Sequence, residues 1–339
     1  MRRSMAAALV LTVLLFGGAY LAAGKTPVQE TAPDGAAQEQ SPQGQRDSGV
    51  ELAVQNGDAV ETMALDVYLR GVVRGEMPAS FEQEALKAQA AAERTYVYYQ
   101  LAAGRKEAHP QADVCTDPAC CNAWLSEEAA REKWGGDFDG WERRIEEAVA
   151  ATDGQVALSD GQPILAVFHS SSAGKTEEAG SVWSGDVPYL RSVDSPEGEE
   201  TVPNYYSAAT FTAAEAKALL SAAHPELTFS GGPDRWFGAA ERDASGRVGT
   251  IEVCGTALRG VEVRRIFSLR SACFTVEAAA EQVTFRVTGY GHGVGMSQYG
   301  ANELARQGKT WQEILTWYYA GITVGPAPET VQTGKAVVQ

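Results

Sequence analysis

The sequence predicts an α+β fold in which mixed helices and an antiparallel sheet form one large folded region. Between residues 65 and 99, apolar side chains recur every three to four positions in two successive segments, which is typical of amphipathic helices. Alternation at 51–54 and a hairpin pattern over 155–168 predict strands. With 339 residues and 44% hydrophobic content, the chain has enough apolar surface for a core.

The first 24 residues predict an N-terminal transmembrane helix. The segment from Met5 to Ala23 is uncharged and close to the roughly 20 residues that span a bilayer. Arg2 and Arg3 are expected to stay in the cytoplasm, which places the rest of a single-pass protein outside the cell membrane. A cleaved signal peptide is the alternative, but Tyr20 and Leu21 stand where its cleavage site needs small residues.

Residues 25–49 predict a disordered tether, since they are rich in Pro, Gln, Gly and Ala and lack large apolar side chains after Val28. The folded region is expected over 50–325, followed by a flexible tail at 326–339. The net charge of −16 excludes unspecific nucleic-acid binding, which needs an excess of Lys and Arg. An uncharged or weakly charged polymer is the better partner.

Glu76 is the candidate catalytic carboxylate because it is predicted to lie in a corner between two helices. Pro78 disfavours helical geometry at Met77, so the first helix should end near Glu76. Ser80 resembles an N-cap, with Gln83 completing a capping box for the next helix. Apolar residues around this corner would raise the pKa of Glu76 by desolvation: Val72, Val73, Met77 and Phe81. Glu82 and Glu84 compete for the role, but both fit a solvated helix face, with Glu84 paired to Lys87.

Four potential metal ligands lie close together in the loop at 105–125: His109, Cys115, Cys120 and Cys121. Cys and His in a set of four suit a closed, structural zinc site. A disulfide from Cys115 to Cys120 or Cys121 is the alternative, but it leaves one thiol over and does not explain His109. Cys254 and Cys273 are either a second bridge or two buried thiols.

Two further loops carry polar groups. The strand ending at Phe168 delivers His169 and Ser170 to 169-HSSSAGKT-176. These residues either bind a polar ligand, form a serine hydrolase site with Ser170 or Ser172 as nucleophile, or only cap a turn. The segment 287-VTGYGHGVGMSQYGA-301 has a glycine at nearly every second position, so its backbone can bend sharply around His292 and Gln298. A capping box at Thr310 and Glu313 starts a last helix.

In order along the chain, the segments 68-YLRGVVRGEMPASFEQEALKAQAAAERTY-96, FHSSSAGKT, LRSACF and GYGHGVGMSQYGAN resemble the stage II sporulation protein D family, also called the SpoIID/LytB family. The resemblance runs from about Glu51 to Gly325. It implies a lytic transglycosylase that acts on peptidoglycan glycan strands, with a preference for strands without their peptides, during engulfment of the forespore. It also implies that Glu76 in the EMP segment is the catalytic acid. A single carboxylate suffices for this reaction, because the 6-hydroxyl of muramic acid attacks its own anomeric carbon.

The resemblance also implies the remaining roles. The His109, Cys115, Cys120 and Cys121 cluster is similar to the zinc loop of clostridial-type members, with Cys120 where a His is expected, and Glu93 stands where Ala is usual. Partners would be a peptidoglycan amidase/endopeptidase and a membrane scaffold of the engulfment machinery. The LytB side of the family implies an alternative, a non-catalytic amidase enhancer. Substrate contacts are expected from Arg94, Tyr96, His169, Ser170, His292, Gln298 and Tyr299.

Overall fold

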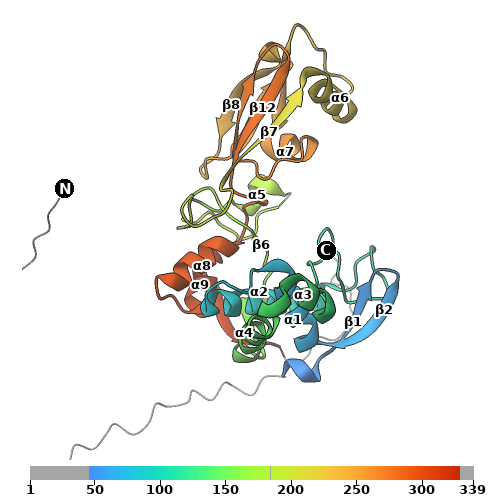
Figure 1. Ribbon diagram of the computed structural model, residues 1–339, viewed down its shortest axis with the longest axis vertical. Helices are drawn as coiled ribbons and strands as arrows, with labels where there is room; N and C mark the ends of the chain where they lie inside the picture. Colours follow the sequence, from blue (N-terminus) through green and yellow to red (C-terminus); the bar gives the residue numbers. More distant parts are fainter. Residues whose placement is uncertain (1–45, 184, 329–339) are drawn as a thin grey trace, which may run out of the picture. The chain divides into compact units, whose positions relative to one another are not determined.

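The computed structural model describes residues 46–183 and 185–328 (Figure 1). The predicted transmembrane helix at 1–24 lies outside these residues, as do most of the predicted tether and tail. Within the described ranges, no helix has the length and apolar character needed to cross a membrane.

The fold is mixed α+β, as the sequence predicted. Its helices are α1 (Leu65–Glu76), α2 (Gln83–Ala103), α3 (Glu127–Trp134), α4 (Phe138–Ala151), α5 (Ala179–Val182), α6 (Ala213–Ala223), α7 (Gly260–Ile266), α8 (Gln298–Arg306) and α9 (Trp311–Tyr318). Short 3-10 turns lie at η1 (Asp47–Gly49), η2 (Gly135–Asp137) and η3 (Pro233–Arg235).

The strands form several small sheets rather than one. They are β1 (Glu51–Asn56), β2 (Ala59–Ala64), β3 (Val114–Cys115), β4 (Gln155–Ser159), β5 (Gln162–Pro163), β6 (Phe168–His169), β7 (Tyr206–Thr212), β8 (Phe237–Arg242), β9 (Val248–Val253), β10 (Thr256–Arg259), β11 (Phe274–Ala278), β12 (Gln282–Thr288), β13 (Met296–Ser297) and β14 (Thr323–Pro326). The sheet orders are β2-β1-β3, β10-β9-β8, β11-β12-β7, β13-β6 and β14-β4-β5. Pairing is antiparallel except between β1 and β3 and between β6 and β13.

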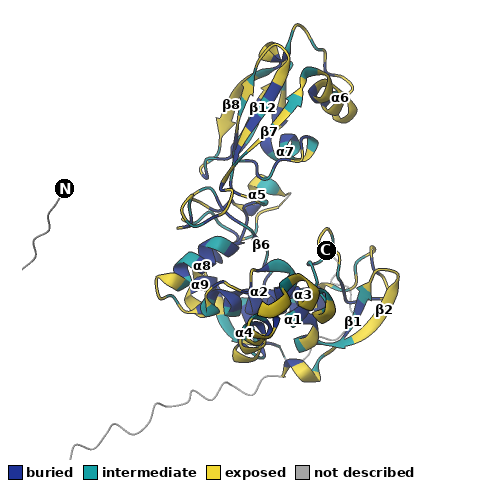
Figure 2. Ribbon diagram, in the orientation of Figure 1, coloured by how far each residue is buried: buried dark blue, intermediate teal, exposed yellow. Residues whose placement is uncertain are grey.

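Helix α2 is the centre of the first hydrophobic core. It contacts α1, α4, α8, α9 and β4, and it is buried along most of its length (Figure 2). The sequence predicted that one apolar face of this helix is buried. The buried surface is wider than predicted, because the sides that carry Gln89, Glu93 and Arg94 are buried as well.

A second hydrophobic core forms between residues 205 and 288. The antiparallel sheets β10-β9-β8 and β11-β12-β7 surround a cluster of phenylalanines, in which the rings of Phe267 and Phe285 lie 4.5 Å apart. The side chains of this core are separate from those of the core around α2.

The predicted capping box at Ser80 is wrong. Helix α2 starts at Gln83 and has Glu82 at its N-cap, with no side-chain cap of its own. The Glu82 N–H instead donates to Asn302 Oδ1 on α8, 2.7 Å away. A side chain 220 positions along the chain therefore satisfies the free donor at this helix start.

The predicted 155–168 hairpin is shorter than expected. Strand β5 pairs with β4 over two residues only, and β6 pairs with β13 instead.

A buried ion pair fixes the start of the folded region. Asp47, which the sequence assigned to the tether, is 2% exposed and accepts hydrogen bonds from Arg94 Nε and from one terminal nitrogen at 2.6 Å. The other terminal nitrogen of Arg94 donates to Thr152 Oγ1 at 3.1 Å. The pair therefore connects the segment before β1 to α2 and to the end of α4.

We expect Asp47→Asn to lower the free energy of unfolding by about 3 kcal/mol, since it leaves the fully buried guanidinium of Arg94 without its counter-charge. Denaturant unfolding at constant pH measures this loss. As a control, Glu127→Gln breaks the exposed pair with Arg131 and should change stability by less than about 0.5 kcal/mol. Equal effects of the two substitutions would contradict the structural role of the buried pair.

Candidate active site

Glu76 is the last residue of α1, as predicted. The chain leaves the helix at Met77, which has an extended backbone before Pro78. Of the surrounding residues, Val72, Val73 and Met77 are fully or almost fully buried. The Glu76 carboxylate therefore lies at the negative end of a helix dipole and beside apolar side chains, and both disfavour its charged form.

The segment 121–125 packs against the same end of α1 at very short range. A Cβ on Gly75 would lie 2.7 Å from the Ala123 carbonyl oxygen, and a Cβ on Gly71 would lie 1.9 Å from Trp124 Nε1. Gly71 and Gly75 are one turn apart on one helix face, so only glycine at both allows this contact. The Leu125 N–H donates to the Gly71 carbonyl at 2.9 Å, which fixes the register.

This contact gives Glu76 its hydrogen-bond donor. The Ala123 N–H lies 2.6 Å from Glu76 Oε1. Burial raises the pKa of Glu76 above its ordinary value of 4.5, and the Ala123 hydrogen bond opposes the rise without cancelling it. The carboxyl group is thus held in place by a backbone donor and biased towards its protonated form.

Glu76 lines a cavity of about 410 Å³ that also contains two tryptophans. Residues 74–80 form one side, and Lys133, Trp134 and Trp141 complete the lining. The Trp134 and Trp141 rings meet edge to face at 5.5 Å. Neither tryptophan was among the predicted site residues; the signal that could have found them is a tryptophan on each side of the Gly135-Gly136 turn. Such rings offer apolar faces with N–H groups at the edge.

Gln298 lies next to Glu76 and Tyr299 lies next to Phe81, while their contacts with substrate stay a prediction. Gln298 Nε2 donates to the Glu76 carbonyl oxygen at 3.0 Å. The Tyr299 ring packs edge to face on Phe81 at 4.9 Å, and the Tyr299 N–H donates to the Ser170 carbonyl. The glycine-rich loop and the corner after α1 therefore form one connected site.

Glu93 is a second carboxyl group near Glu76, but it has no exposed surface. Its Oε1 accepts from Gln89 Nε2 at 2.7 Å, whereas Oε2 has no partner. Burial and the neighbouring Glu76 raise the pKa of Glu93 well above its ordinary value. It is therefore a neutral acid in the interior, where no substrate can reach it.

His169 and His292 face each other across the two polar loops, with ring centres 5.7 Å apart. His169 Nε2 lies 2.7 Å from Ser172 Oγ, and His292 Nδ1 accepts from the Val294 N–H at 3.1 Å. Burial lowers the pKa of His169 well below 6.5 and that of His292 to about 4, so both are neutral at pH 7. Ser172 is completely buried, which argues against the serine hydrolase, and Ser170 contributes its backbone carbonyl.

A buried carboxylate joins these loops. Glu197 is 4% exposed; it accepts from the Ser172 N–H and the Ser195 hydroxyl, both at 2.6 Å, and from the Ser297 hydroxyl. Its hydrogen bonds connect the loop after β6 to the start of α8. Gly300 is required beside it, because a Cβ there would lie 2.5 Å from Glu197 Oε2. Sequence reasoning gave Glu197 no role, since nothing local distinguishes it.

Two residues predicted to contact substrate lie elsewhere. Arg94 is 0% exposed and forms an ion pair with Asp47, so it stabilises the fold and does not contact substrate. Tyr96 is 8% exposed, and its hydroxyl accepts from Lys106 Nζ at 2.9 Å beside the cysteine cluster. Since they are two positions apart, they face different sides of α2: Arg94 faces Asp47, and Tyr96 faces Lys106 and the cysteine cluster.

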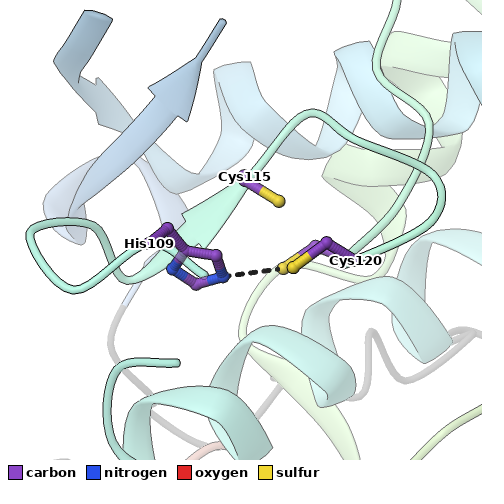
Figure 3. A group of neighbouring side chains, drawn as sticks. His109, Cys115 and Cys120 are labelled. Atoms are coloured by element: carbon purple, nitrogen blue, oxygen red, sulfur yellow. Dashed lines mark hydrogen bonds between the residues drawn. The ribbon is translucent and has the colours of Figure 1, made fainter. Parts of the chain in front are cut away.

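The predicted metal ligands come together in one cluster (Figure 3). One ligand atom from each of His109, Cys115, Cys120 and Cys121 lies within 4.8 Å of the others. His109 Nδ1 is 2.9 Å from the Ala112 carbonyl oxygen, which leaves Nε2 directed at Cys121 Sγ, 3.3 Å away. With metal–sulfur bonds of about 2.3 Å and metal–nitrogen bonds of about 2.1 Å, such spacing suits tetrahedral coordination. All five cysteines are free thiols in the structure, so neither predicted disulfide alternative is formed.

The cluster and the carboxylate share a segment. Two residues after Cys121 comes Ala123, which donates to Glu76, and then Trp124, which packs on Gly71. Any metal held by the four residues would restrain this segment.

Comparison with known proteins points to the same family as the sequence motifs around Glu76 and the metal cluster. A profile described as "Stage II sporulation protein" (SpoIID) matches residues 54–158, which include Glu76 and the metal cluster. The chain is 36% identical to stage II sporulation protein D of Bacillus subtilis (strain 168) over 269 residues, which cover 79% of this chain and 76% of that protein. The chain belongs to the stage II sporulation protein D family.

Two further relatives match most of this chain. Stage II sporulation protein D of Bacillus amyloliquefaciens is 35% identical, with 79% of this chain and 76% of that protein covered. An amidase enhancer of Bacillus subtilis (strain 168) is 29% identical over 76% of this chain and 40% of its own length. Both branches named by the sequence resemblance are therefore represented.

The raised pKa of Glu76 predicts a stability effect with a definite sign. The folded state binds this proton more tightly than the unfolded chain, so its stabilisation is present below pH 4.5 and lost as the pH rises through the folded pKa. Glu76→Gln keeps an oxygen for the Ala123 N–H and avoids burying a charge. Its melting temperature should exceed that of the wild type at neutral pH, and the difference should vanish near pH 4. The exposed residue Glu82 provides the control, and a Glu82→Gln variant should show no such trend.

Proposed function

We propose that this protein is a peptidoglycan lytic transglycosylase that cleaves the β-1,4 bond between N-acetylmuramic acid and N-acetylglucosamine. One observation carries the proposal: Glu76 is the sole carboxylate lining the cavity beside Trp134 and Trp141, within the described part of the chain. Hydrolysis by the common route needs two carboxyl groups across the scissile bond. A transglycosylase needs one.

In the proposed mechanism Glu76 acts first as acid and then as base. Its raised pKa favours the protonated form that donates to the leaving glycosidic oxygen. The resulting carboxylate accepts the proton of the muramic acid 6-hydroxyl as that oxygen attacks the anomeric carbon, which closes a 1,6-anhydro ring. The Ala123 N–H stabilises the carboxylate in between.

Other carboxylates near the corner are occupied or inaccessible. Glu84 pairs with Lys87 at 2.6 Å, as predicted, and accepts from the Trp311 N–H at 2.8 Å. Glu82 is half exposed and lies near Arg306. Glu93 is completely buried.

We expect Glu76→Gln to reduce cleavage of purified glycan strands by about a thousandfold, because it removes the carboxylic acid that protonates the leaving oxygen. Mass spectrometry of the wild-type digest should show 1,6-anhydromuramic ends. Glu84→Gln is the matched control and should retain most activity. Reducing ends in the digest, or near-normal activity of the Glu76 variant, would refute the assignment.

A non-catalytic amidase enhancer is the second candidate, supported by the 29% identity to such a protein. The two candidate functions differ in whether the purified protein releases a product. An enhancer releases no product by itself, with or without Glu76, but accelerates an added amidase. The retained carboxylate with its donor and cavity supports the enzyme over this alternative.

For the cysteine cluster we propose structural zinc, held by His109, Cys115, Cys120 and Cys121. Four protein ligands fill a tetrahedral site and leave no position for water. Zinc would hold the 105–125 loop, whose regular structure is limited to the two residues of β3.

Elemental analysis should find one zinc per chain, and chelation should lower the melting temperature and move the segment that contacts Glu76. Cys121→Ser should lower the zinc content, whereas Cys254→Ser, outside the cluster, should not. Less than half an equivalent of zinc, together with loss of free thiols at Cys115, Cys120 and Cys121, would favour a disulfide instead.

The names of the relatives support a proposal for the cellular process in which the protein acts. We propose that the protein acts in sporulation, remodelling septal cell wall during engulfment. It would be held in the cell membrane by its N-terminal segment, with the catalytic region outside. An amidase/endopeptidase that removes peptides and a membrane scaffold would be its partners.

A further inference from the structure

Four polar side chains meet between the glycine-rich loop and the turn that joins β8 to β9. They are Glu177, Asp243, Ser245 and Arg247, and we call them the Glu177 cluster. Glu177 is 3% exposed and Arg247 is 2% exposed. None of the roles proposed above uses these residues.

The hydrogen-bond geometry of the cluster requires a bound proton. Ser245 Oγ lies 2.7 Å from Glu177 Oε2 and 2.7 Å from Asp243 Oδ1. A hydroxyl carries one hydrogen, so Ser245 donates to only one of the two carboxyl groups. The other must hold a proton of its own and donate it to Ser245 Oγ, because a second carboxylate would face the lone pairs of that oxygen at hydrogen-bond distance. The cluster therefore contains one carboxylic acid and one carboxylate.

The proton belongs to Glu177 rather than to Asp243. Asp243 Oδ1 also accepts from two backbone N–H groups, that of Ser245 at 2.9 Å and that of Arg247 at 3.0 Å, which favour its charged form. Glu177 Oε1 accepts from the N–H of Glu178 at 2.9 Å. Burial raises the pKa of Glu177 above its ordinary value of 4.5, and the Asp243 carboxyl raises it further, although a hydrogen bond from Ser245 favours the charged form.

One negative charge balances the buried guanidinium of Arg247. Its Nη1 donates to the Lys175 carbonyl at 2.9 Å and to Ser245 Oγ at 3.1 Å, and its Nε has no acceptor among the described residues. With Glu177 protonated, the charges of Arg247 and Asp243 cancel. An ionised Glu177 would add a second negative charge in a place removed from water, which is unfavourable.

The other ionisable groups around Glu177 do not supply a compensating positive charge. Lys175, on the same segment, pairs with Asp194 at 3.4 Å on the surface, and Glu178 is exposed. On the glycine-rich loop, burial lowers the pKa of His292 to about 4, so its ring is neutral at pH 7. The balance of charge therefore depends on the cluster itself.

The cluster contacts the glycine-rich loop directly. The Glu177 N–H donates to the Gly293 carbonyl at 2.7 Å, and a Cβ on Gly293 would lie 2.6 Å from Arg247 Nη2. The same loop continues to Gln298, which donates to the Glu76 carbonyl. The Glu177 cluster thus connects the turn between β8 and β9 to the segment that reaches the candidate active site.

We propose that Glu177 is a positioning residue whose proton holds the glycine-rich loop against the turn between β8 and β9, and that loss of this proton loosens the contact. Because the folded protein binds the proton more tightly than the unfolded chain, the stabilisation is present below pH 4.5 and is lost as the pH rises through the folded pKa of Glu177. The inference does not depend on the reaction assigned to Glu76.

Hydrogen exchange followed by mass spectrometry tests this on the full-length protein, in peptides that cover 173–178 and 289–295. Each variant is compared with the wild type at the same pH, which cancels the intrinsic pH dependence of exchange. Glu177→Gln has an NH2 group that donates to Ser245 at any pH. Its two segments should exchange as in the wild type at acidic pH and about tenfold more slowly than in the wild type at alkaline pH. Glu178→Gln, at the exposed neighbouring position, is the control and should match the wild type throughout.

Asp243→Asn should reverse the trend. It leaves Glu177 as the negative partner of Arg247, so ionised Glu177 becomes the favoured form and the loop should loosen at acidic instead of alkaline pH. Alkaline loosening in Glu177→Gln equal to that of the wild type would overturn the proposal, as would an unchanged trend in Asp243→Asn. Thermal unfolding checks that each variant folds, and Glu177→Gln decides alone if Asp243→Asn does not. Neither measurement needs a cleaved product, so the result is separate from that for the transglycosylase.

Discussion

The candidate site depends on the close approach of the 121–125 backbone to one face of α1. Glycine at positions 71 and 75 permits it, since a Cβ at either would overlap Trp124 or the Ala123 carbonyl. The contact places one N–H at 2.6 Å from Glu76 Oε1. A carboxyl group at the C-terminal end of a helix would otherwise have no fixed orientation, and Pro78 ensures that the helix ends there.

Three features converge on this contact. The cysteine and histidine cluster immediately precedes it in the chain, so the loop is restrained from that side. Helix α2 provides the interior wall, where Glu93 is kept neutral and Arg94 is used for an internal ion pair. From the C-terminal part, Gln298 holds the Glu76 carbonyl and Asn302 caps the start of α2. The carboxylate thus sits where segments from distant parts of the sequence are fixed to one another.

The two polar loops are connected to each other through a buried carboxylate. Glu197 accepts hydrogen bonds from the Ser172 N–H of one loop and from the Ser297 hydroxyl of the other, and the neutral histidines lie between the loops. The glycines of the 289–295 segment are needed for contacts within the protein: Gly295 has φ 72°, and a Cβ there would lie 2.1 Å from the Val167 carbonyl oxygen. The backbone of this loop therefore packs closely against Val167, the residue before β6.

The sequence by itself determined features that depend on neighbouring residues: the end of α1 at Glu76, the capping box at Thr310, the four metal-ligand types and the family. Helix termination by proline and capping by side chains act over a few residues, so they can be read locally. Only the tertiary structure decided that Arg94 is internal, that Asn302 replaces Ser80 as a cap, and that Trp134 and Trp141 share a cavity with Glu76. The same holds for the second core. Burial and charge pairing depend on which segments meet across hundreds of positions, and no periodicity or short motif records that.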